Sequence, residues 1–84
     1  MLESYITFRS LTQAQQGKRA LQAYEIYAQL TKAPKTLAER GCTHALLLKG
    51  VELPQAANAL RVYGVPFRKI VRLDGSGNLV EVRV

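Results

Sequence analysis

The sequence predicts an α+β protein, a ferredoxin-like βαββαβ sandwich in which two helices cover one face of an antiparallel sheet and an extra C-terminal strand forms a hairpin. Two patterns alternate along the 84 residues. Some segments have apolar residues at every second position, as strands do, and others have them every three or four positions, as helices do. Glycine and proline separate these segments. The resulting order is strand, helix, strand, strand, helix, strand, followed by one more strand.

The first strand and helix are predicted at the N-terminal end. Residues 5–9 alternate aromatic or β-branched side chains with polar ones, which is typical of a half-buried strand. Ser10 and Thr12 are candidate N-caps, each followed three residues later by glutamine as in a capping box, so we expect a helix over about 12–24. Gly17 inside that helix costs about 1 kcal/mol relative to alanine. We therefore expect the helix to approach the strands closely at this glycine.

The middle of the chain predicts two strands and a long loop. Residues 26–31 form a short second strand, and the loop runs over about 32–41 because Pro34 cannot donate a hydrogen bond within a sheet. A third strand over 43–49 contains an uninterrupted Ala-Leu-Leu-Leu run. Such a run is typical of a strand that is buried on both faces.

The C-terminal part completes the sheet. An apolar stripe predicts a second helix over about 54–63, ended by Gly64. A fourth strand follows over 67–73. The glycine-rich turn 74–78 then leads into an alternating strand over 79–84, so the chain is expected to end in a hairpin.

Length and composition bound the function. The chain is 48% hydrophobic with a formal net charge of +6, and its length allows a single domain over 1–84 with a βαββαβ core at about 3–73. One cysteine and one histidine exclude a disulfide framework and a structural zinc site, so we expect no metal and no cofactor. The sequence shows neither a signal peptide nor an apolar run of membrane-spanning length. We expect a cytoplasmic protein that does not bind membranes.

Cys42 is the main candidate for chemistry. Arg40 and His44 lie within two residues of it, and Lys32 and Lys35 precede it in the basic loop. Positive charge stabilises the thiolate, which is the nucleophilic form of cysteine. Free cysteine also commonly packs as a small buried hydrophobe, so the residues alone leave both interpretations open.

Other functions are open to a small basic domain. With one histidine, no paired carboxylates and no phosphate-binding glycine loop, we expect no self-contained enzyme. A nucleic-acid-binding module would use the positive charge and stacking rings, but its aromatic signature is absent and we rank it second. A third hypothesis is a homodimer in which the last strand pairs with a second copy at the sheet edge. The rings and the edge residues concerned are Tyr5, Tyr27, Tyr63 and Phe67, and Val80, Val82 and Val84.

The chain resembles the family of putative Se/S carrier protein-like domains over about residues 5–73. The resemblance rests on the opening Tyr-Ile-Thr-Phe-Arg-Ser at 5–10, a proline-bearing loop matching Pro34, Cys42 ahead of Ala-Leu-Leu, and the Gly-Val exit of the second helix. The family tends to have glycine and an aliphatic residue after the cysteine, whereas Thr43 and His44 stand here.

The resemblance implies that Cys42 accepts sulfur or selenium as a persulfide or its selenium analogue. Arg40 and His44 would then stabilise the thiolate, with Lys35 and Lys32 as further binding residues. It also implies donor and acceptor proteins as partners, such as a cysteine desulfurase or a protein similar to the sulfur carrier TusA. Transfer of this kind needs an accessible thiolate and a mobile approach to the partner, and no cofactor.

Overall fold

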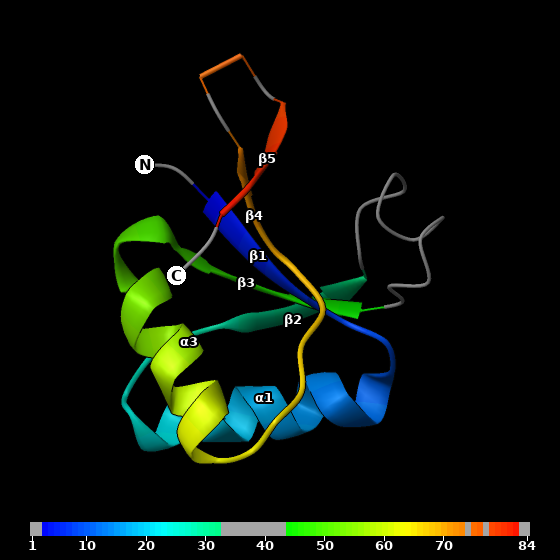
Figure 1. The fold of residues 1–84 in the computed structure, drawn as a ribbon, viewed down its shortest axis with the longest axis vertical. Helices are drawn as coiled ribbons and strands as arrows, with labels where there is room; N and C mark the ends of the chain where they lie inside the picture. Colours follow the sequence, from blue (N-terminus) through cyan, green and yellow to red (C-terminus); the bar gives the residue numbers. More distant parts are fainter. Residues whose placement is uncertain (1–2, 33–43, 74, 77, 83–84) are drawn as a thin grey trace.

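The computed structural model describes residues 3–32, 44–73, 75–76 and 78–82 (Figure 1). In chain order the elements are β1 (Glu3–Phe8), α1 (Leu11–Ala23), β2 (Gln29–Lys32), β3 (His44–Lys49), the 3₁₀ helix η1 (Gly50–Glu52), α3 (Leu53–Val62), β4 (Ile70–Leu73) and β5 (Leu79–Glu81).

The strands form one five-stranded antiparallel sheet in the order β2-β3-β1-β4-β5. The first strand is therefore central, with Ile6 opposite Leu46 of β3 on one side and opposite Ile70 of β4 on the other. The predicted α+β class and the terminal hairpin of β4 with β5 are confirmed. β2 and β5 are the sheet edges, and the pairing of β5 with a second copy stays a prediction.

The hydrophobic core lies on one face of the sheet, against both helices. Ile6, Phe8 and Leu46 alternate along β1 and β3 and are fully buried in one cluster with residues of α1 and α3. Ala45 and Val71 belong to the opposite face and are buried outside that cluster. Figure 1 shows α1 and α3 side by side, and the two helices contact each other.

Gly17 sets the distance between α1 and the sheet. A Cβ atom at this position would lie 2.8 Å from Cζ of Phe8 and 3.3 Å from Cδ1 of Leu46. Because real Cβ atoms do not approach other carbons that closely, any larger residue would push the helix away from the strands. The close packing predicted from the sequence is confirmed. Of the two candidate N-caps, the structure uses Ser10, whose hydroxyl accepts a hydrogen bond from the backbone N–H of Gln13, so the helix begins at Leu11, one residue before the predicted start.

The end of α1 explains why β2 starts later than predicted. Glu25 adopts a left-handed conformation with φ of 59°, and its N–H donates to the carbonyl of Gln22. Ile26, predicted to open the strand, instead donates its N–H to the carbonyl of Leu21 and closes a Schellman cap. The strand consequently begins at Gln29.

The end of α3 has the same kind of cap. Gly64 has φ of 66° and donates to the carbonyl of Arg61, while Val65 donates to that of Leu60. The glycine cap is confirmed. The helix predicted over about 54–63 ends one residue earlier, at Val62, and Tyr63 is the C-cap residue, with a side chain that is 55% exposed. Its ring makes an edge contact with Tyr24, which occupies the matching position after α1.

Replacing Gly17 with alanine tests the close approach of α1. Alanine improves helix propensity by about 1 kcal/mol, but the clash with Phe8 costs about 1–3 kcal/mol, so we expect the free energy of unfolding to fall by up to about 2 kcal/mol. Urea unfolding measures the change. The matched control is Gln15→Ala at an exposed position of the same helix, where stability is expected to change little. A more stable Gly17→Ala variant would contradict the close packing.

Candidate functional site

The predicted site residues divide into two groups. Cys42, Arg40 and Lys35 lie outside the described residues. Lys32 and His44 are described, and the sheet places them opposite each other in the antiparallel pair of β2 and β3.

His44 occupies the first position of β3, at the end of the sheet where β1 and β2 finish. It is paired with Lys32 on one side and with Phe8 on the other. Directly opposed residues of a sheet project on the same face, so His44 lies on the face that α1 covers. The imidazole is half-buried, whereas Lys32 is exposed to solvent.

A bulge brings two further cations to this end of the sheet. The N–H of Thr7 donates to the carbonyl of Lys69 (2.8 Å), and the carbonyl of Thr7 accepts from the N–H of Arg68 (2.7 Å). Arg68 and Lys69 therefore both lie opposite the single residue Thr7 of β1, which is the pattern of a β-bulge. The Thr7 hydroxyl accepts from the N–H of Lys69 at 3.0 Å and donates to the Lys69 carbonyl at 3.2 Å. It thereby replaces the ladder hydrogen bond that the bulge removes. The bulge also explains why β4 begins at Ile70 and not at the predicted residue 67.

These positions form what we call the basic sheet end, which consists of Arg9, Lys32, His44, Arg68 and Lys69. Of the acidic residues whose side-chain exposure the structure describes, Glu25 follows α1 and Glu52 lies beyond β3, both away from this end of the sheet. Glu81 on β5 is closer, because it is opposite Val71, two residues along β4 from Lys69. In Figure 1 the end of β2, the start of β3 and the start of α1 lie on the same side of the molecule. Sequence reasoning missed Arg68 and Lys69 because only their pairing with Thr7 of β1 brings them to the end of the sheet that carries His44, and it missed Arg9, which follows β1 at that end.

Chain connectivity links Cys42 to the basic sheet end. One residue, Thr43, separates it from His44 along the chain, and Cys42 itself lies outside the described residues. The N-terminus of α1 follows β1 at the same end and has no acidic residue in its first turn. Its partial positive charge adds to that of the side chains at this end of the sheet.

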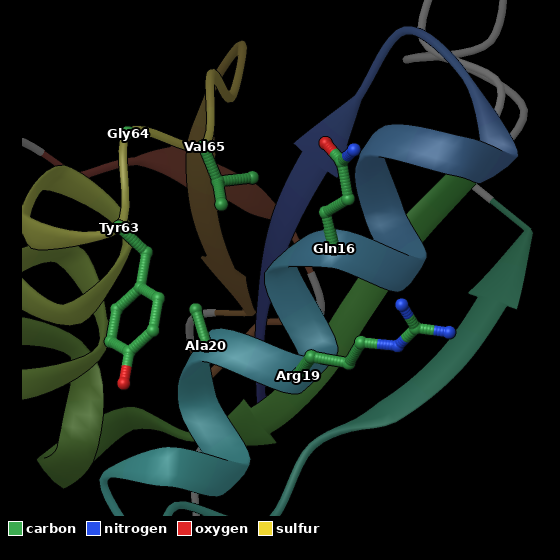
Figure 2. A pocket seen from close by; sticks show the side chains of 6 residues that line it. All are labelled: Gln16, Arg19, Ala20, Tyr63, Gly64 and Val65. Carbon is green, nitrogen blue, oxygen red and sulfur yellow. The ribbon is translucent and has the colours of Figure 1, made fainter.

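A second feature is the surface depression between α1 and the end of α3 shown in Figure 2. It has a volume of about 390 Å³, and Gln16, Arg19 and Tyr63 supply its polar side chains. In Figure 2 the Arg19 guanidinium points away from Tyr63. The polar groups therefore do not converge on one point, as they do in binding sites for small ligands.

The side chains and helices that the structure describes also bear on other kinds of site, a metal site and a membrane-spanning helix. Within the described ranges, no three His, Cys, Asp or Glu side chains lie close enough together to bind a metal ion. In the same part of the chain, no helix is both long and apolar enough to cross a membrane.

Comparison with known families assigns the chain. The model of the family described as Putative Se/S carrier protein-like matches residues 3–72. The chain belongs to this family. The match includes Cys42 and all five residues of the basic sheet end, and it confirms the resemblance found in the sequence. No curated protein and no solved structure matches the chain.

Replacing Thr7 with valine tests the bulge that positions Arg68 and Lys69. Valine has nearly the same shape but no hydroxyl, so the Lys69 N–H loses its partner, and we expect the free energy of unfolding to fall by about 1–3 kcal/mol. Hydrogen exchange should also show faster exchange of the Lys69 amide. The control is Thr31→Val on the same face of β2, where the change is expected to be near zero. Equal stability of the two variants with an equally protected Lys69 amide would contradict this role.

Proposed function

We propose that this protein carries sulfur or selenium on Cys42, receiving the atom from a donor protein and passing it to an acceptor. The observation that carries the proposal is membership of the Se/S carrier-like family over a match that includes the chain's single cysteine. The positive charge at the basic sheet end adds to it, because the chain holds Cys42 within two residues of His44.

The proposed transfer conserves atoms and electrons. The Cys42 thiolate attacks the outer sulfur of a persulfide on the donor cysteine. The bond between the two donor sulfurs breaks, the donor leaves as a thiolate, and Cys42 holds the persulfide. An acceptor nucleophile then attacks the outer sulfur and releases the Cys42 thiolate. The protein is consumed and regenerated in each cycle, so in this proposal it is a carrier and not an enzyme with its own substrate turnover.

Each neighbour has a proposed electrostatic role. Arg40 and His44 stabilise the thiolate before attack and again when it leaves, because both states carry negative charge on sulfur. Lys35 and Lys32 contribute at longer range. No side chain is required as a general base, since a thiolate that already exists needs no deprotonation.

The fold fits this proposal at the level of its topology. We assign it to the ferredoxin-like class on the basis of its βαββαβ order and of β1 lying between β3 and β4, with β5 added at the edge. In this arrangement β2 ends and β3 begins at the same end of the sheet as the start of α1. That end is where we place the chemistry.

Nucleic-acid binding has less support. Single-strand recognition on such a sheet uses rings on the open face of the central strands. That face carries Tyr5 and Thr7 on β1 but Ala45 and Leu47 on β3. The most exposed ring, Tyr27 at 78% exposure, follows α1 and lies outside the sheet.

The mass of the intact protein tests the carrier function. The reduced protein is incubated with a cysteine desulfurase and cysteine, and in a second reaction with selenocysteine as the substrate. We expect a gain of one sulfur or one selenium atom that a thiol reductant removes. The relative rates of the two reactions show which element is preferred.

Cys42→Ser is the matched control, because it removes the thiol and keeps the size of the side chain. It is expected to gain no mass in either reaction. The absence of any adduct on a wild-type thiol that iodoacetamide readily alkylates would contradict the carrier function.

A further inference from the structure

We propose that the basic sheet end is the docking surface for an acidic protein surface that surrounds the donor's persulfide. This inference rests on the proposed carrier function and identifies the chemistry of the partner. Its key residues are Lys32, Arg68 and Lys69.

The strand pairing gives the size of this surface. Lys32 on β2 is two strands away from Phe8 on β1, and the bulge sets Arg68 and Lys69 one strand further. With about 4.8 Å between neighbouring strands, the cations span about 15 Å across the sheet. A surface of that width is comparable to the central part of a small protein interface.

The charge is available for binding. Lys32 and Arg68 are exposed, and Lys69 is half-buried and anchored by its backbone through Thr7. The bulge holds Arg68 and Lys69 at fixed backbone positions, so less conformational freedom is lost when a partner binds. Cations in a fixed arrangement beside a reactive group attract an acidic partner and orient it on encounter.

The positions of the aromatic rings favour a protein partner over a nucleic acid. Tyr24 and Tyr63 contact each other at the C-terminal ends of the two helices. The 13-residue α1 separates this pair from the basic sheet end by about 20 Å. At the basic sheet end itself Phe8 is fully buried and Phe67 packs against the core. Among the described residues, no exposed ring lies beside these cations to stack on bases.

Sulfur transfer between proteins makes such docking useful. The attacking thiolate must approach the outer sulfur of the donor persulfide in line with the bond that breaks, so the two proteins must be oriented correctly. The rate is then set by how often the two surfaces meet in the correct orientation. Opposite charges raise that rate, and salt lowers it by screening.

The test compares two sulfur donors. Persulfide transfer from a cysteine desulfurase is measured for the wild type, for the double variant Arg68→Gln/Lys69→Gln and for Lys49→Glu, which changes the net charge by the same amount as the double variant. Lys49 is exposed at the opposite end of β3 and serves as the control for net charge. Each protein is also loaded with inorganic polysulfide, which needs no docking surface. Both reactions are run at about 0.05 M and about 0.5 M salt.

We expect the double variant to lose about tenfold or more of the transfer rate from the desulfurase at low salt, together with most of its salt dependence. Lys49→Glu should stay within about twofold of the wild type, and loading by polysulfide should change by less than about threefold in every variant.

Other results would contradict the proposed docking surface, and each would indicate a different role for these cations. Equal slowing with both donors would mean that these cations act on the thiol. Equal slowing by Lys49→Glu would mean that only net charge matters. Loading of the wild type by polysulfide but not by the desulfurase would support the carrier function and reject this docking partner. No loading by either donor would reject the carrier function itself. Salt-sensitive binding of a single-stranded RNA that the double variant loses, with normal sulfur transfer, would assign the cations to nucleic acid.

Discussion

The arrangement of this protein depends on the central position of β1 and on the contact that its last core residue makes with α1. β1 is hydrogen-bonded on both sides, and Phe8 at its end meets the helix where Gly17 leaves room. This contact fixes how closely α1 lies on the sheet and therefore where its N-terminus begins. The basic sheet end is built around the same residue, because Phe8 is opposite His44 and next to the bulge.

The bulge at Thr7 connects fold and function. In a regular antiparallel ladder, β4 would begin before Ile70, and its side chains would alternate strictly between the two faces of the sheet. The extra residue instead puts Arg68 and Lys69 opposite one threonine, Thr7. The Thr7 hydroxyl accepts from the backbone N–H of Lys69, which the bulge leaves without a ladder partner. Bulges often occur beside functional sites, where they redirect side chains. Here the bulge adds two cations to an end of the sheet that already carries Lys32 and His44.

Much of the fold followed from local patterns, and the site followed only in part. The sequence was sufficient to predict the alternation in β1, the N-cap at Ser10 and the glycine cap at Gly64, because each depends on residues that are close in sequence. The late start of β2 was not, since a left-handed Glu25 gives no clear signal in the sequence. Arg68 and Lys69 could not be assigned to the site either. They reach it through pairing with a strand about sixty residues away.

The proposed carrier function depends most directly on Cys42 reacting as a thiolate. The most direct measurement is the rate of its alkylation by iodoacetamide across a range of pH, since only the thiolate reacts. We predict that the midpoint of the profile, which gives the pKa of the Cys42 thiol, lies below the value of about 8.5 that is usual for a free cysteine. A midpoint at or above that value, or a thiol that reacts only after unfolding, would contradict the account.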